Sequence, residues 1–240
     1  MKTWVVGDIH GHSKMLKLAY LATNMNKGDR IIFLGDYVDR GSDSYGVVDF
    51  IIGLQKYHPI ICLRGNHDDE FHKGLMFGNY SMFQHGARET LESYVQNCKP
   101  QLGTNLTDLR LSDLPQSHQD FFTNLKSYYQ DELGNFFVHA GIDRHKMIYE
   151  QSEEVLFWDR DLLDSSRSFH ASNKKLQYTF KIKDGSIKHI YVGHTPQLKK
   201  GIHSQCNDTI WMTDIGLSHA FEDRKSTRLN SSHVSESRMP

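Results

Sequence analysis

Short apolar runs alternate with helical segments along the first seventy residues of the chain. Each apolar run ends in a polar turn that contains glycine, and a segment with apolar residues at roughly helical spacing follows it. This alternation is typical of βαβ units, in which successive strands lie parallel in one sheet. The pattern predicts strands over 3–6, 31–34 and 60–63, with helical segments around 16–22 and 47–54.

The middle of the chain predicts helices rather than strands. Residues 72–133 carry no strand pattern, so we expect a helical insertion there, with helices over 86–95 and 116–125. Residues 164–175 are rich in serine, lysine and asparagine, and this composition indicates an exposed loop. Strand patterns return over 135–138, 189–192 and 209–213. The whole pattern predicts an α/β fold.

The C-terminal segment differs from the rest because it shows no apolar periodicity. Residues 223–233 also match one reading frame of a widely used DNA-sequencing adapter over eleven consecutive positions. We therefore expect a folded domain over residues 1–222, with its natural C-terminal end truncated. Residues 223–240 are then an unstructured tail that derives from adapter sequence, and a disordered basic tail is the alternative.

Composition limits the possible functions. The chain has 240 residues, 38% of them hydrophobic, which is enough for one domain with a substantial core. It has no run of 18 apolar residues and no secretory leader, so we expect a cytoplasmic protein without a membrane partner. Three distant cysteines argue against a disulfide framework, and a net charge of −1 argues against nucleic acid. Fifteen histidines suggest a metal site.

The candidate ligands follow the predicted strands, at the edge where open α/β sheets bind ligands. They are Asp8 and His10 on one loop, then Asp36, Asn66, His139 and His194, each after a separate strand. Oxygen ligands mixed with imidazole suit Mn²⁺, Fe or Zn²⁺ better than Ca²⁺. Six ligands are too many for one tetrahedral ion with an open position. They suit two divalent ions about 3.5–4 Å apart that share a carboxylate.

Five sequence blocks carry a family resemblance. They are GDIHG at 7–11, GDYVDRG at 35–41, RGNHD at 64–68, VHAG at 138–141 and GHTP at 193–196. In this order they resemble the calcineurin-like metallophosphoesterases, and within them the phosphoprotein phosphatase branch with its bacterial and phage members. Softer matches occur at 88–94 and 156–160, and the resemblance spans about residues 3–219. It implies two packed mixed β-sheets flanked by helices.

The resemblance implies a role for each ligand. Asp8 and His10 hold the first ion, and Asp36 bridges both ions. Asn66, His139 and His194 hold the second ion. We expect two divalent ions, most simply Mn²⁺, with Fe or Zn²⁺ as alternatives.

The resemblance also implies four catalytic residues. His67 donates a proton to the leaving group, and Asp39 orients His67. Arg40 grips the phosphate, and Arg160 is the second phosphate arginine. Arginine suits phosphate because its planar fork donates to two oxygens at once.

Three functions fit these residues. The favoured one is a serine/threonine phosphatase acting on phosphoproteins or phosphorylated small molecules, by direct attack of a hydroxide that bridges the two ions. Symmetrical diadenosine tetraphosphate hydrolases are the first alternative, but they usually carry alanine where this chain has Asp39. A non-catalytic binding module is the second alternative, which a complete ligand set with His67 and Asp39 disfavours.

Overall fold

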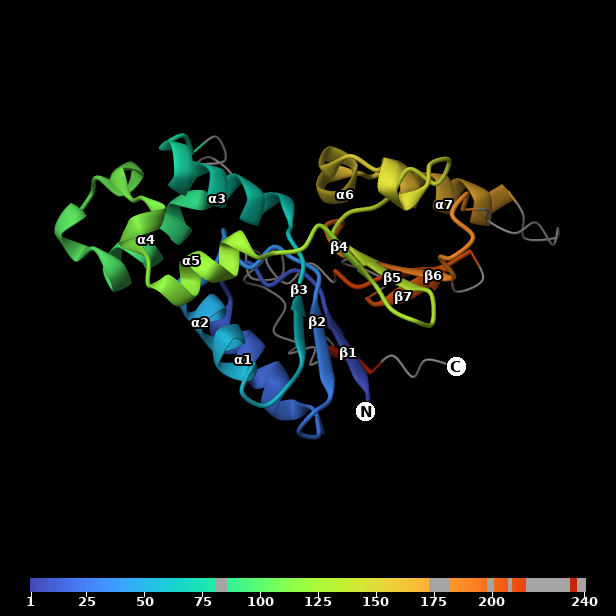
Figure 1. Ribbon diagram of the computed structural model, residues 1–240, viewed down its shortest axis with the longest axis horizontal. Coiled ribbons are helices and arrows are strands. Elements are labelled where there is room, and N and C mark those ends of the chain that lie inside the picture. The colour runs from blue at the N-terminus through green and yellow to red at the C-terminus, as the bar shows by residue number, and fades with distance from the viewer. Residues whose placement is uncertain (81–85, 173–181, 198–200, 207–208, 215–233, 237–240) are drawn as a thin grey trace, which may run out of the picture.

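The computed structural model describes residues 1–80, 86–172, 182–197, 201–206, 209–214 and 234–236. Two β-sheets face each other at the centre, and helices cover their outer faces (Figure 1). This arrangement confirms the predicted mixed α/β fold with two sheets flanked by helices.

Sheet one contains the predicted N-terminal strands. Strands β1 (Thr3–Val6), β2 (Arg30–Phe33) and β3 (Ile60–Cys62) run parallel in the order β3-β2-β1. Helices α1 (Ser13–Ala22) and α2 (Ser44–Leu54) connect them. The βαβ prediction is therefore confirmed for this part of the chain.

Sheet two is built from the second half of the chain. Its order is β4-β5-β6-β8-β7, with β5, β6 and β8 parallel and the two edge strands antiparallel. The strands are β4 (Tyr128–Gln130), β5 (Asn135–Val138), β6 (His189–Val192), β7 (His203–Gln205) and β8 (Ile210–Met212). The pattern predicted the three parallel strands and missed both edge strands, which are three residues long.

Alternating side chains explain why both faces of each sheet are covered. In β2, Ile31 and Phe33 pack against the helices, whereas Ile32 packs between the sheets. In β5, Phe137 also packs between the sheets, and Phe136 lies on the outer face. Because side chains alternate along a strand, each buried strand needs apolar residues at every position.

The insertion covers one end of sheet one with helices α3 (Asn66–Phe77), α4 (Ala87–Cys98) and α5 (Gln116–Thr123) (Figure 1). Short 3-10 turns at Pro100–Leu102, Leu106–Asp108 and Leu111–Asp113 separate the last two. The predicted helical insertion is confirmed up to the start of β4.

Helices α6 (Glu153–Trp158) and α7 (Asp161–Ser172) cover the outer face of sheet two (Figure 1). A further 3-10 turn, Ile148–Glu150, precedes α6. The expectation of a loop over 164–175 is wrong for the residues that α7 contains, and 173–175 lie outside the described residues. Buried Leu162 and Leu163 anchor the first turn of α7, and the Asp159 carboxylate accepts a hydrogen bond from the Leu162 amide at 2.9 Å. This anchoring outweighs the polar composition of the segment.

Strand β9 (Val234–Glu236) pairs antiparallel with β1. These three residues therefore contradict the expectation of a wholly unstructured tail, and the other residues of 223–240 lie outside the described ones. An open sheet edge presents unpaired backbone N–H and C=O groups that can bind any extended segment. This pairing therefore does not require a strand pattern in residues 234–236. Within the described residues, no helix has the length and apolar character needed to cross a membrane.

Candidate dinuclear metal site

The six predicted ligands converge where the carboxyl ends of the two sheets meet. Asp8 and His10 follow β1, and Asp36 follows β2. Asn66 begins α3 after β3. His139 and His194 follow β5 and β6 of the other sheet. All six side chains are buried, although carboxylates and imidazoles ordinarily avoid the interior.

One group of ligands draws on both sheets. The Asn66 side-chain oxygen lies 3.0 Å from His139 Nε2 and 3.0 Å from His194 Nδ1. One oxygen of Asp36 lies 3.5 Å from His139 Nε2. Asp36, His139 and His194 each offer a ligand atom within 4.8 Å of the others. We call Asp36, Asn66, His139 and His194 the second position, as in the predicted ligand set.

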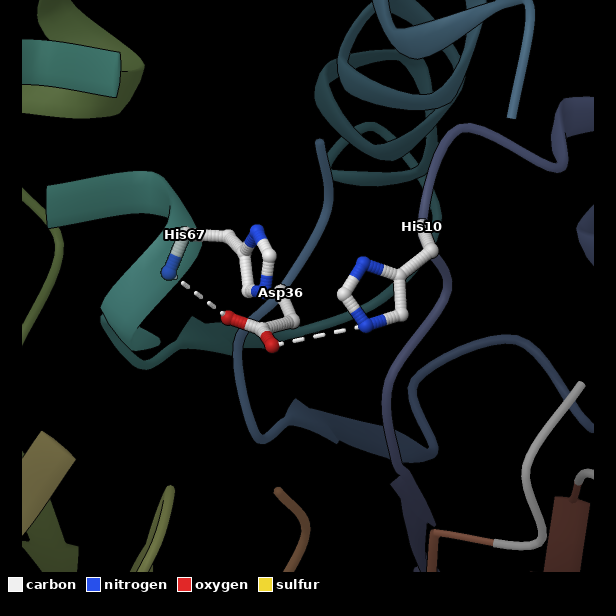
Figure 2. Close-up of side chains that lie close together, drawn as sticks. All are labelled: His10, Asp36 and His67. Carbon is white, nitrogen blue, oxygen red and sulfur yellow. Dashed lines mark hydrogen bonds and ion pairs between the residues drawn. The ribbon is translucent and has the colours of Figure 1, made fainter. Parts of the chain in front are cut away.

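The other group draws on sheet one. His10 Nε2 lies 3.5 Å from the second oxygen of Asp36 and 3.9 Å from Asp8 Oδ2. The contact between His10 and Asp36 is drawn as a dashed line in Figure 2. The remaining oxygen of Asp8 accepts a hydrogen bond from the His194 amide at 3.1 Å. We call Asp8, His10 and Asp36 the first position. Asp36 thus directs one oxygen toward each position.

One compact group of candidate ligands around His10 differs from the predicted set. His10, Asp36 and His67 offer ligand atoms within 4.8 Å of one another, and Asp8 falls outside this group. Figure 2 shows the three side chains side by side, with the His67 backbone amide donating to Asp36. His67 is therefore a neighbour of the first position, whether it acts as an acid or as a ligand.

Backbone carbonyls orient two of the imidazoles. His10 Nδ1 lies 2.9 Å from the carbonyl oxygen of Val38, and His139 Nδ1 lies 2.9 Å from that of Leu34. A carbonyl can only accept, so Nδ1 carries the proton in both rings and Nε2 presents a lone pair. Such hydrogen bonds from the far nitrogen are typical of metal-binding histidines.

The loops that carry the site are strained. Six non-glycine residues in the described part of the chain have positive φ, and five belong to the predicted site: His10, Asp36, Asp39, Arg40 and His194. Such conformations are costly for residues with a Cβ and persist where the surrounding structure imposes them. A Cβ at Gly65 would clash with the Asp36 carboxylate, so glycine there permits the close approach of the two loops.

Asp68 holds two of these loops together, and the sequence analysis assigned it no role. Its carboxylate accepts hydrogen bonds from the amides of Asp36 at 2.7 Å, Tyr37 at 2.9 Å and Gly65 at 2.9 Å. Burial and the Asp36 charge raise the pKa of Asp68 to about 7. Its place in the RGNHD block was the available signal, but only the fold shows that it reaches the loop after β2.

Electrostatics fit the site to divalent cations. Burial and the carboxylates of Asp214 and Asp36 raise the pKa of Asp8 well above its usual value. Burial lowers the pKa of His10 and His139, and it lowers that of His194 to about 3. Neutral imidazoles and crowded carboxylates are the donors that a divalent cation binds, and its charge would offset the repulsion among the carboxylates. Buried His194 Nε2 has no hydrogen-bond partner among the residues that the structure describes.

The predicted acid pair is present beside the first position. His67 Nδ1 lies 2.7 Å from Asp39 Oδ2, and both side chains are buried. Burial alone would lower the pKa of His67, but the charges of Asp36 and Asp39 raise it. Arg40 Nη2 lies 3.3 Å from His67 Nε2, so one predicted phosphate arginine borders the acid.

The second predicted phosphate arginine, Arg160, lies between α6 and α7 and is exposed. Its charge contributes to lowering the pKa of His194, after burial and His139. The neighbouring Trp158 is 40% exposed, and its ring centre lies 6.3 Å from that of His194. The structure therefore places Arg160 near enough to the second position for its charge to act on His194.

A sequence profile of the calcineurin-like phosphoesterases matches residues 1–198, so the chain belongs to this family. The predicted resemblance to calcineurin-like metallophosphoesterases is therefore confirmed, and so is the prediction of a dinuclear metallophosphoesterase of the hydrolase class.

Two curated relatives carry the same name. The asymmetrical bis(5'-nucleosyl)-tetraphosphatase PrpE of Anoxybacillus flavithermus is 33% identical over 101 residues, which cover 38% of this chain and 41% of that protein. The enzyme of that name from Oceanobacillus iheyensis is 24% identical over 212 residues, or 83% of this chain and 79% of that protein.

A solved structure matches most of the fold. The cold-active protein-tyrosine phosphatase of a psychrophilic Shewanella species superposes with a TM-score of 0.56 at 15% identity, covering 90% of this chain and 72% of that one. At this identity the likeness concerns the fold alone, and the fold does not choose between substrates.

Proposed function

We propose that this protein hydrolyses bis(5'-nucleosyl) tetraphosphates with two divalent ions, most simply Mn²⁺, held by Asp8, His10, Asp36, Asn66, His139 and His194. The observation that carries the proposal is the buried ligand set that shares Asp36. The names of the two curated relatives support the dinucleotide as substrate. We therefore rank hydrolysis of a dinucleoside tetraphosphate, the substrate class of the first alternative above but not its symmetrical cleavage, ahead of the serine/threonine phosphatase that Asp39 favoured.

The ligand residues serve the reaction by holding cations where the substrate phosphates bind. When bound, two divalent ions polarise phosphoryl oxygens and lower the pKa of water, so that hydroxide is available at neutral pH. Arg40 binds phosphate oxygens beside His67, and Arg160 binds others near His194. Two separate arginines suit a chain of four phosphates, which carries more negative charge than a monoester does.

The proton on His67 completes the reaction. An oxygen derived from water forms a bond to one phosphorus, and the bond from that phosphorus to the bridging oxygen breaks. The departing nucleotide takes the electron pair of the broken bond and a proton from His67 Nε2. Asp39 keeps the imidazole oriented and protonated through the 2.7 Å contact with Nδ1.

Hydrolysis of phosphoserine or phosphothreonine in proteins is the second candidate, because the Asp39–His67 pair is complete. An alkoxide is a poorer leaving group than a nucleotide, so it depends more on a well-oriented acid. The intact pair is the feature that favours this candidate.

A substrate panel separates the candidates. Metal-stripped protein reloaded with Mn²⁺ is assayed with diadenosine tetraphosphate, a phosphoserine peptide and p-nitrophenyl phosphate. We expect kcat/KM for the dinucleotide to exceed that for the peptide by about 100-fold, equivalent to about 2.7 kcal/mol of transition-state binding. The opposite preference would establish the phosphatase. If the protein holds two ions but hydrolyses none of the three substrates, that result would favour a non-catalytic binding module.

The products identify the bond that breaks. ATP with AMP would show asymmetrical cleavage, as in the names of the two relatives above, and ADP alone would show symmetrical cleavage.

A further inference from the structure

Thr90 connects the helical insertion to the proposed acid pair. It lies one turn into α4, and its side chain is fully buried. Its hydroxyl donates to Asp39 Oδ1 at 2.8 Å and accepts from the Asp39 amide at 2.6 Å. A third contact, at 2.9 Å, joins it to the Ser44 hydroxyl at the start of α2. None of the proposed metal ligands comes from α4.

The hydrogen-bonding capacity of Thr90 fixes the direction of these bonds. A hydroxyl has one proton and two acceptor sites. The proton goes to the Asp39 carboxylate, which can only accept, and one acceptor site takes the Asp39 amide. Ser44 must therefore donate to the second acceptor site. The proton and both acceptor sites of the Thr90 hydroxyl are therefore all in use. The hydrogen bonds that run from Ser44 through Thr90 to Asp39 then have one fixed direction, and Asp39 in turn contacts His67.

The backbone that Thr90 holds is strained. Asp39 has φ of 72° and Arg40 has φ of 67°. The Arg40 amide donates to the carbonyl of Gly86, just before α4, at 3.1 Å. Gly86 and the first turn of α4 thus hold this segment at two amides and one carboxylate oxygen. The other carboxylate oxygen of Asp39 remains for His67.

We propose that Thr90 is a positioning residue for proton donation by His67. By binding both the amide and one carboxylate oxygen of Asp39, it aims the other oxygen at His67 Nδ1 and so holds the imidazole in one orientation. The inference rests on the proposed hydrolysis of phosphoesters, but not on which phosphoester is the natural substrate. It gives the insertion a part in the chemistry beyond covering sheet one.

Ser93 provides a matched control for a purely structural role. It lies one turn further along α4, it is also buried, and its hydroxyl accepts from the Tyr45 amide of α2 at 3.1 Å. Like Thr90, it links α4 to α2 through one hydroxyl. No described contact joins it to Asp39.

The test compares Thr90→Val, Thr90→Ser and Ser93→Ala in the full-length chain loaded with Mn²⁺. Substrates are aryl monophosphates and aryl esters of nucleoside monophosphates, with leaving groups of graded pKa. For the poorest leaving groups we expect Thr90→Val to lower kcat by about 10-fold or more, which is part of the 10²–10⁴ that a general acid supplies. The loss should shrink for p-nitrophenol, with KM and metal content near those of the parent.

The two other variants complete the comparison. Thr90→Ser keeps the hydroxyl and should restore most of kcat for the poor leaving groups. Ser93→Ala should lower thermal stability to a similar extent as Thr90→Val, without any dependence of kcat on the leaving group. If Thr90→Val does not fold, Thr90→Ala removes the same hydroxyl with less bulk and is held to the same expectation.

An equal loss for all leaving groups, or the same profile in Ser93→Ala, would overturn the role of Thr90 while leaving the proposed function intact. A parent protein that binds two ions and hydrolyses none of the esters would overturn the proposed function, and the role of Thr90 with it.

Discussion

The two proposed metal positions differ in where their ligands come from. The first position takes Asp8, His10 and Asp36 from the two adjacent loops after β1 and β2 of sheet one. The second position takes Asp36 and Asn66 from sheet one but both histidines from sheet two. Asp36 lies 3.5 Å from an imidazole in both positions, but Asn66 lies 3.0 Å from each imidazole of the second, whereas His10 lies 3.9 Å from Asp8 in the first. A cation at the second position would therefore link the two sheets, and one at the first would not.

The largest effect is expected where the two positions meet. Asp36→Asn removes the one charge that both positions share, so we expect the variant to bind neither ion tightly. Loss of two ions should lower kcat/KM by roughly 1000-fold or more, because each supplies several kcal/mol of transition-state stabilisation. Metal analysis after gel filtration measures how many ions the variant retains. Two tightly bound ions in this variant would show that Asp36 does not bridge them.

A matched pair of histidine variants tests the difference between the positions. His10→Ala and His194→Ala each remove one buried imidazole, and each should leave one ion per chain. Bound ligand stabilises a fold by about 2.7 kcal/mol at 100 times its dissociation constant. We expect Mn²⁺ to raise the melting temperature of His10→Ala almost as much as that of the parent, and that of His194→Ala much less. Equal responses would contradict the claim that only the second position links the two sheets.

His67→Asn decides whether His67 belongs to the acid pair or to the first position. As an acid, it is not needed for metal binding, so the variant should keep both ions and lose about 10²–10⁴ in kcat. The loss should be smallest for p-nitrophenyl phosphate, whose leaving group needs no proton. Loss of one ion would instead make His67 a ligand with His10 and Asp36.

The smallest effect is expected at the edge of sheet one. A chain that stops after Glu222 lacks β9 and exposes the free edge of β1. If the short pairing contributes about 1 kcal/mol, its loss should lower the melting temperature by about 2–4 °C and promote association through the open edge. Both metal positions should be unaffected. A genomic read across codons 222–240 without adapter sequence would remove the hypothesis that the tail is an artefact.

Sequence reasoning predicted the parts of the molecule that depend on local patterns. Every parallel strand in the described part of the chain was predicted, because buried strands are continuous apolar runs that end in glycine-containing turns. The short edge strands β4 and β7 and the helix α7 were missed, since tertiary packing rather than composition determines them. Leu162 and Leu163 anchor the start of α7 through their burial. The segment that follows them is polar, so its composition alone does not predict a helix.

The candidate site divides in the same way. The proposed metal ligands lie in motifs, so they could be named before the fold was known. Asp68 and Thr90 act through contacts with residues 32 and 51 positions earlier, and no local pattern reveals such distant partners. The substrate was the weakest inference, because it rested on the single residue Asp39.

Electron paramagnetic resonance of the Mn²⁺-loaded protein tests the central claim most directly, because two ions that share a carboxylate couple magnetically. We predict a coupled spectrum for the parent at two equivalents of Mn²⁺. For His194→Ala we predict the spectrum of an isolated ion at any Mn²⁺ concentration. The spectrum of isolated Mn²⁺ in the parent at every ratio, with full phosphoesterase activity, would contradict a dinuclear site bridged by Asp36.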